Sequence, residues 1–202
     1  MRRAARTVSV LVLCAVIIVA FYMYLNKAAG KRTEYKQEQA VTEMDRLLDV
    51  DFSKNYPPTP REVIKWYNRY STLCFGDKKP TKKQTEKIAA KMHELLDDEL
   101  ANANPESEYA ASLWSQVQDF TQRKAKIYES DVCNTDDIIY KTIDKRDYAY
   151  VQATYYIREA SSFTTTYQKF VLRQDENDNW KIVGFSRTDK NGTPVTTTTK
   201  TK

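Results

Sequence analysis

Tyr148-Ala-Tyr-Val-Gln-Ala-Thr-Tyr-Tyr-Ile157 is the stretch of this 202-residue sequence that decides the fold. Its residues alternate between two kinds. Ala149, Val151 and Ala153 form a small, apolar face, and larger polar or aromatic side chains occupy the positions between them. Strict alternation predicts a β-strand with one buried face. Because the apolar face is small, it suits packing against helices.

Further strand-like segments surround this stretch. From Lys126 onward the chain is rich in Tyr, Thr, Ile and Val, and turn residues recur at regular intervals. The turns at 159–162 and 175–179 predict antiparallel neighbours. We therefore expect five strands, near residues 125–132, 137–143, 147–159, 163–174 and 179–187.

Three helices are predicted before the strands. Thr59-Pro60-Arg61-Glu62 combines a threonine N-cap, a proline in the first helical position and a capping glutamate, and Gly76 marks the end of this helix. A second helix opens at the capping box Thr81–Gln84 and carries its apolar stripe to Leu100, and a third begins at Asn104-Pro105. Helices followed by strands predict an α+β domain, with helices packed on one face of a curved antiparallel sheet.

An uninterrupted apolar run, Val8–Leu25, precedes this domain. Its eighteen residues span about 27 Å as a helix, close to the ~30 Å hydrocarbon layer of a membrane. With Arg2, Arg3 and Arg6 before it, the run predicts a transmembrane signal anchor with the domain outside the cytoplasm. Two alternatives stay open: a cleavable signal peptide, and the opposite orientation, since basic residues also follow the run.

The sequence thus divides into four parts. Residues 1–26 form the N-terminal tail and the transmembrane signal anchor, and residues 27–58 a juxtamembrane helix and a Pro-containing connector. The α+β domain covers residues 59–188. A Thr- and Lys-rich tail at 189–202 is expected to be disordered.

The formal net charge of +5 does not describe the folded part. Residues 33–186 hold 22 Lys and Arg against 26 Asp and Glu, a net charge of −4. A mildly acidic domain lacks the basic face that contacts with a phosphate backbone need. We therefore expect no nucleic-acid partner.

Four stretches carry a resemblance to known proteins. Pro60–Asp77 resembles the opening helix of nuclear transport factor 2-like (NTF2-like) domains, and Asp178–Phe185 resembles their last long strand. Together with Asp136–Tyr140 and Tyr148–Ala153, these stretches make the chain similar to an uncharacterised family of membrane-anchored proteins of Gram-positive anaerobic bacteria. The resemblance covers about residues 55–188. It implies an NTF2-like cone, in which a strongly bent sheet wraps around helices and leaves a cavity at its open end.

Aromatic residues supply the candidate ligand-binding pocket. Ligand pockets are mostly apolar with a few polar groups, so rings on the concave side of the sheet could line one. The alternative is that the same rings fill the core. The candidate lining residues are Trp66, Tyr67, Tyr70, Trp114, Tyr155 and Phe170.

Residues suited to catalysis or metal binding are scarce. His93 is the single histidine and lies at the edge of a helix rich in Lys and Glu. We interpret Asp97-Asp98-Glu99 as a solvated face. Asp175–Asn179 is a hairpin turn, because it lacks the central glycine and the distant glutamate of a calcium loop. The sequence therefore predicts no catalytic residue, no metal and no cofactor.

Cys74 and Cys133 are the two cysteines outside the apolar run. In an extracytoplasmic domain they could form a disulfide, which would stabilise the fold by closing a long loop. The alternative is two separate buried thiols, because sequence spacing does not place them within bonding distance.

Together these features predict a non-enzymatic, membrane-anchored, extracytoplasmic binding module for a protein, peptide or small-molecule ligand. Two other functions stay open. One is an enzyme of NTF2-like fold that acts on a small hydrophobic or cell-wall-derived substrate. The other is a structural accessory subunit of a membrane complex.

Overall fold

The computed structural model describes residues 43–195. Residues 43–48 are helical and include the boundary between two compact units, which end and begin at Leu47 and Leu48. The predicted anchor at Val8–Leu25 lies outside the described residues. Between residues 43 and 195, no helix has both the length and the apolar character needed to cross a membrane. The following paragraphs concern the unit that begins at Leu48.

This unit is an α+β domain with a curved antiparallel sheet, which confirms the predicted fold class at that level. All five strands lie within two residues of their predicted bounds. The helices are α2 (Pro60–Phe75), α3 (Lys82–His93), α4 (Asp98–Ala103) and α5 (Glu106–Gln122). The strands, with one 3-10 turn η1 (Thr135–Asp137), are β1 (Ala125–Val132), β2 (Ile139–Ile143), β3 (Arg146–Glu159), β4 (Ser162–Gln174) and β5 (Trp180–Thr188).

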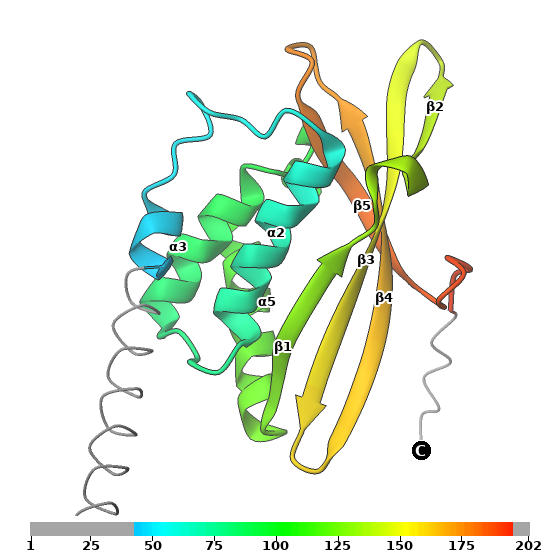
Figure 1. Cartoon of the computed structure of the whole chain (residues 1–202). Coiled ribbons are helices and arrows are strands. Elements are labelled where there is room, and N and C mark those ends of the chain that lie inside the picture. The colour runs from blue at the N-terminus through cyan, green and yellow to red at the C-terminus, as the bar shows by residue number, and fades with distance from the viewer. Residues whose placement is uncertain (1–42, 196–202) are drawn as a thin grey trace, which may run out of the picture. The chain divides into compact units, whose positions relative to one another are not determined.

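The strand β3, which contains Tyr148–Ile157, is the centre of the sheet. The strand order is β1-β3-β4-β5, and β2 pairs with the first half of β3. The helices lie on one side of the sheet (Figure 1). Ala149, Val151 and Ala153 point to that side and are fully buried, as the alternation predicts, and Phe170 and Leu172 of β4 are buried beside them.

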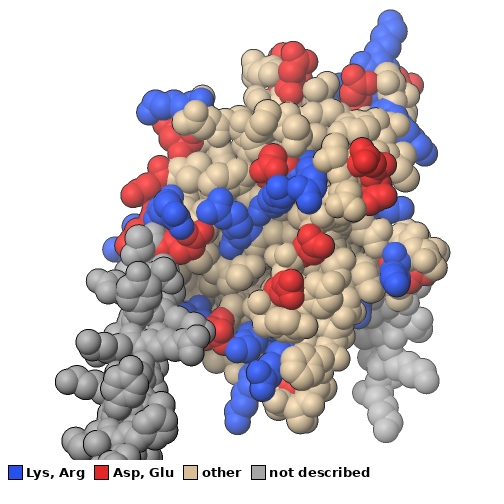
Figure 2. Space-filling model, viewed as in Figure 1, with Lys and Arg blue, Asp and Glu red and all other residues tan. Residues whose placement is uncertain are grey.

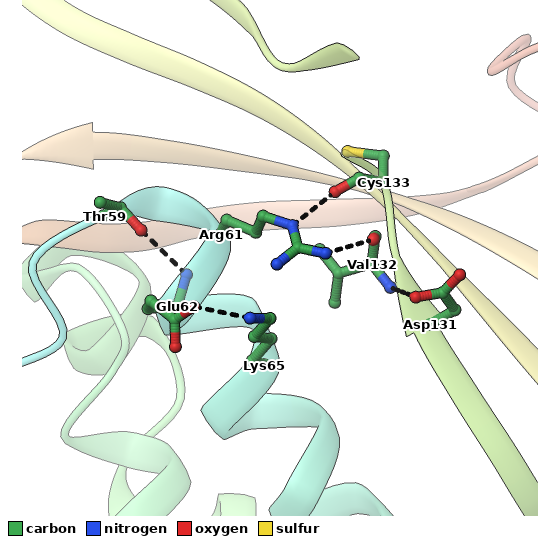
Figure 3. Close-up of polar contacts among 7 residues, drawn as sticks. All are labelled: Thr59, Arg61, Glu62, Lys65, Asp131, Val132 and Cys133. Carbon is green, nitrogen blue, oxygen red and sulfur yellow. Dashed lines mark hydrogen bonds and ion pairs between the residues drawn. The ribbon is translucent and has the colours of Figure 1, made fainter. Parts of the chain in front are cut away.

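The helix α2 is fixed to the edge of the sheet by its first turn (Figure 3). Thr59 caps the helix by accepting a hydrogen bond from the Glu62 N–H at 3.2 Å. Arg61 donates from Nε to the Cys133 carbonyl oxygen at 2.8 Å and from Nη2 to that of Val132 at 3.3 Å. A cation that holds edge carbonyls blocks them from pairing with another strand, so α2 closes this end of the β1 edge.

Gly76 ends α2 for a different reason from the one usually given for a C-terminal glycine. Its φ of −75° is open to any residue, so no left-handed conformation requires glycine here. Its N–H instead donates to the Thr72 carbonyl oxygen at 2.8 Å, and a Cβ atom at this position would lie 2.5 Å from that oxygen. The close approach of the two backbone segments excludes a side chain.

The second predicted helix ends earlier than its apolar stripe suggests. The capping box of Thr81 and Gln84 is present, but α3 stops at His93. The chain then runs beside β5: the Ile182 N–H donates to the Leu95 carbonyl at 2.9 Å, and the Asp97 N–H donates to the Ile182 carbonyl at 2.8 Å. The prediction that this helix continues to Leu100 is therefore wrong, because residues 95–97 pair with β5 instead of continuing the helix.

Both ends of the predicted domain extend further than expected. Phe52, in the connector, is buried and packs edge-on against Trp66 at 5.5 Å between ring centroids. After β5 the chain turns onto the face of the sheet that the helices leave open, where Gln152 Nε2 donates to the Lys190 carbonyl at 3.1 Å. Residues 189–195 of the predicted tail thus form a turn, and residues 196–202 lie outside the described part.

Charges of both signs lie on the surface of the domain. On the face shown in Figure 2, Lys and Arg side chains are interspersed with Asp and Glu, and uncharged residues separate them. No single sign of charge dominates that face.

Candidate functional site

Three adjoining cavities surround the turn between β4 and β5, and we call them together the strand-end groove. The largest, of about 790 Å³, lies between residues 97–99, the start of β3 and the turn. A second of about 700 Å³ lies between the turn and the connector at 52–56, and a third of about 370 Å³ lies beside Tyr140 and Trp180. The first shares Asp175 and Lys181 with the second, and it shares Asp147 and Gln174 with the third.

A buried ion pair forms the floor of the largest cavity. Arg173 of β4 donates from Nη2 to Asp97 Oδ1 at 2.6 Å and from Nε to Asp97 Oδ2 at 3.2 Å. The two side chains are only 11% and 6% exposed, and Glu99 Oε1 lies 3.1 Å from the same Nη2. The Asp97 carboxylate raises the pKa of Arg173 above its usual value. Both oxygens of the Asp97 carboxylate are thus occupied by charged hydrogen bonds to Arg173.

Asp97 also connects this floor to a helix. Its Oδ1 accepts a hydrogen bond from the Glu99 N–H at 3.1 Å, which caps α4. The structure therefore corrects the interpretation of Asp97-Asp98-Glu99 as one solvated face. Asp98 and Glu99 are exposed, but Asp97 is buried and joins α4 to β4.

The rim of the largest cavity carries an excess of carboxylates. Seven acidic and four basic residues line it, and several of the acidic side chains are exposed. A cleft lined mainly by one sign of charge attracts ligands of the opposite sign. The acidic residues are Asp97, Asp98, Glu99, Asp147, Asp175, Glu176 and Asp178, and the basic ones are Lys145, Arg146, Arg173 and Lys181.

The wall of the second cavity is held by backbone contacts. The Tyr56 hydroxyl donates to the Trp180 carbonyl at 2.9 Å, and burial raises the pKa of Tyr56. Lys181 Nζ donates to the Glu94 carbonyl at 2.8 Å and lies 4.2 Å from the centre of the Tyr56 ring. Burial lowers the pKa of Lys181. These contacts give the groove a fixed aromatic and cationic wall beside the carboxylate rim.

The β4–β5 turn, which lies between the cavities, is stabilised by one of its own side chains, that of Asp175. Asp175 Oδ1 accepts hydrogen bonds from the N–H groups of Asn177 at 2.8 Å and Asn179 at 2.9 Å. Asp178 adopts a left-handed φ of 61°, which aspartate tolerates better than most residues. This is the hairpin turn that the sequence predicts. Among residues 43–195, no three His, Cys, Asp or Glu side chains are arranged to hold a metal ion.

The six candidate pocket residues lie elsewhere, and none of them lines the strand-end groove. Tyr67, Tyr155 and Phe170 meet between α2 and the sheet, where the Tyr67 and Phe170 ring centroids are 5.3 Å apart. The Tyr155 hydroxyl donates to Asn68 Oδ1 at 2.5 Å, and burial raises the pKa of Tyr155. The three rings are therefore part of the core between α2 and the sheet.

The remaining three candidates form no common lining. Trp66 and Tyr70 lie 6.2 Å apart, and both contact Phe52 of the connector. Tyr70 is fully buried, whereas Trp66 is partly exposed. Trp114 lies on α5, partly exposed. A ligand at these residues remains a prediction.

The two cysteines are free thiols and lie far apart. Cys133 follows β1 and contacts Arg61 through its carbonyl, while Cys74 lies thirteen residues further along α2, or about 20 Å. The side chain of Arg61, which reaches Cys133, is much shorter than this distance along α2, so the two cysteines lie outside the range of a disulfide. Burial raises the pKa of Cys74 to about 12 and also raises that of Cys133, which disfavours the reactive thiolate. The single histidine, His93, lies 2.9 Å from the Asn104 carbonyl through Nε2.

A comparison with known families identifies the family of this chain. Residues 1–185 match the family described as "Domain of unknown function (DUF6715)". The chain belongs to this family. No curated protein matches it.

The DUF6715 match spans the whole strand-end groove, since the groove residues lie between Phe52 and Lys181. Sequence reasoning missed this site. Its floor joins Asp97 to Arg173, which are 76 residues apart, and only the pairing of residues 95–97 with β5 brings them together. The charged cluster at 97–99 and the polar turn at 175–179 were the local signals in the sequence.

Proposed function

We propose that this DUF6715 protein is a non-enzymatic, single-span envelope protein whose NTF2-like domain lies outside the cytoplasm and binds a polypeptide segment carrying Lys or Arg side chains. The observation that carries this proposal is the strand-end groove, a solvent-open hollow with a carboxylate-rich rim and an aromatic wall. A cationic segment matches the charge of this rim.

Three features favour binding over catalysis. The carboxylate at the bottom of the groove is paired with Arg173, the thiols have raised pKa values, and aromatic rings occupy the helix–sheet interior. An enzyme of this fold would need a desolvated carboxylate or a His–Asp pair facing an open cavity. Among the described residues, the carboxylate at that place has both oxygens hydrogen-bonded to Arg173.

The proposed location of the domain outside the cytoplasm rests on the sequence. The apolar run Val8–Leu25 and the three arginines before it support a signal anchor of a bacterial envelope protein. The bent sheet beside α2 supports the NTF2-like comparison, whereas the run of helices before the main strands departs from the usual order of that fold. Protease added to intact cells should degrade the domain; protection until lysis would place it inside and remove this part of the proposal.

A binding measurement tests the groove itself. A short fluorescent peptide of alternating Lys and Ser residues is titrated against the full chain in nanodiscs, with a Glu–Ser peptide as the probe control. Saturable binding of the Lys peptide that weakens with salt is expected, because screening reduces contacts between charges. Asp98→Lys with Glu176→Lys should weaken it by about tenfold, equivalent to about 1.4 kcal/mol.

The matched control is Glu86→Lys with Glu129→Lys, which changes the net charge equally. Both residues are exposed, and neither lines the groove. The control should bind the Lys peptide nearly as well as the unaltered chain. Equal losses in the two variants, or no binding at all, would contradict the proposed groove.

A further inference from the structure

The strand β2 is an exposed edge of the sheet. It pairs only with β3, and all five of its residues are exposed. Three of them are large and apolar: Ile139 is 53% exposed, Tyr140 53% and Ile143 44%. In Figure 1 the β2–β3 hairpin projects from the domain, and β2 forms its outer side. An apolar edge with free backbone groups is a template for pairing with another strand.

The register of the hairpin shows which backbone groups are available. Asp144 and Lys145 form a two-residue turn with positive φ values of 51° and 64°, so Ile143 and Arg146 are the hydrogen-bonded pair next to the turn. Hydrogen-bonded and non-bonded pairs then alternate along the ladder. The N–H and C=O groups of Tyr140 and Thr142 are therefore directed away from β3.

We propose that β2 pairs with β2 of a second copy of this chain, antiparallel, about a two-fold axis at Lys141. In this register Tyr140 exchanges two hydrogen bonds with Thr142 of the partner subunit, and Thr142 does the same with the partner's Tyr140. Ile139 faces Ile143 of the partner subunit across a close, non-bonded pair. Shifting the strands by two residues would place Lys141 opposite an isoleucine and lose both apolar pairs.

The charges that flank β2 fit the same arrangement. Asp136 and Asp137 of η1 precede the strand, and the segment that follows it, Asp144-Lys-Arg-Asp147, carries two basic and two acidic side chains. Antiparallel pairing places Asp137 of each copy opposite Lys145 of the partner subunit and Asp136 opposite the partner's Arg146, so opposite charges face each other at both ends of the strand. A parallel arrangement would instead bring the Asp136 and Asp137 carboxylates of the two copies together.

Lys141 limits the strength of the pairing. The two copies of Lys141 meet at the axis, where like charges oppose association. Its Nζ lies 5.5 Å from the centre of the Tyr150 ring, on its own β3, which draws the charge away from the axis. One short strand per copy also buries a small area, so a weak dimer results. Anchoring both copies in one membrane, as proposed above, raises their effective concentration.

Cysteine cross-linking of the full chain in native membranes tests the register. Lys141→Cys faces its own copy across the axis, at a Cα separation of about 4.5 Å that lies in the range of a disulfide. Under mild oxidation it should form a dimer several-fold more than the unaltered chain, which reports the background from native cysteines. Thr165→Cys, exposed on β4, reports random collision.

Two further variants separate register from simple proximity. Ile139→Cys and Ile143→Cys should each give little dimer alone, but their coexpression should give a mixed dimer, because each faces the other. The proposal would be overturned if Lys141→Cys gave no more dimer than the unaltered chain or Thr165→Cys. Equal dimer yields for the three single variants at 139, 141 and 143 would overturn it as well. Cross-linking of Lys141→Cys to a protein of different mass would assign the edge to another partner and also overturn it. The cross-linking is carried out without the Lys–Ser peptide, because Tyr140, Lys141 and Thr142 also line the third cavity of the groove.

Discussion

Replacing Asp97 by Asn separates the charge of this residue from its role as a cap. Asparagine caps helices about as well as aspartate, so the start of α4 should persist. The change removes the negative charge from the pair with Arg173, whose side chain is 11% exposed. Arg173 is left with Glu99, 3.1 Å away and on the solvent side. The free energy of unfolding should therefore report the charge pair alone.

The expected loss follows from the burial of both groups. Removing one partner of a buried ion pair costs about 3–5 kcal/mol, because the other charge remains desolvated. Glu99 and one remaining amide hydrogen bond offset part of this cost, so we expect about 2–3 kcal/mol. For a domain of this size that corresponds to a fall in melting temperature of roughly 10 °C.

Urea unfolding of the full chain in micelles, followed by near-ultraviolet circular dichroism, measures this loss. The matched control is Glu159→Gln, which breaks the pair with Arg123, where the side chains are 32% and 44% exposed. Exposed pairs contribute up to about 1 kcal/mol, so the control should change little. If Asp97→Asn falls within 0.5 kcal/mol (roughly the spread of a neutral surface change) of the unaltered chain, the reasoning about the groove floor is refuted.

Three further predictions concern the domain around the groove. Gly76→Ala should lower the free energy of unfolding by about 1–3 kcal/mol, since its Cβ would meet the Thr72 carbonyl oxygen at 2.5 Å; an unchanged urea midpoint would contradict this. Tyr155→Phe should cost about 1–3 kcal/mol in the same assay, because it leaves Asn68 Oδ1 buried without its donor, whereas Tyr128→Phe on the exposed face should be neutral. Cys74 should resist iodoacetamide in the folded chain at pH 8 and react in urea, because its pKa of about 12 lies far above the working pH. The raised pKa also predicts that the free energy of unfolding falls as the pH rises from about 9 towards 12. Rapid labelling of the folded chain would refute the burial of Cys74, on which both predictions depend.

The strands and helix starts were readable from local sequence. Alternation in Tyr148–Ile157, the cap at Thr59 and the capping box at Thr81 each depend on neighbouring residues, and each is present in the structure. The break after His93 was not readable, because Leu95, Leu96 and Leu100 continue a helical stripe. Its cause is pairing with Ile182, a contact that no local pattern encodes.

The site was harder to predict than the fold for the same reason. Aromatic residues such as Tyr67 and Phe170 have the composition of a pocket, but the rings of both are buried against each other between α2 and the sheet. The groove forms where three segments distant in sequence meet: residues 97–99, the β2–β3 hairpin and the β4–β5 turn. Asp97 and Arg173 look like ordinary surface charges until these segments are brought together.

Fluorescence of Trp180 tests the central claim most directly. Trp180 lines the third cavity of the groove and contacts Tyr140 at 5.8 Å between ring centroids, whereas Trp66 and Trp114 lie outside the groove. In the full chain carrying Trp66→Phe and Trp114→Phe, the Lys–Ser peptide should change the Trp180 emission saturably, and Asp98→Lys with Glu176→Lys should suppress that change. Peptide binding that leaves Trp180 emission unaltered, or an unchanged response after charge reversal, would contradict the account.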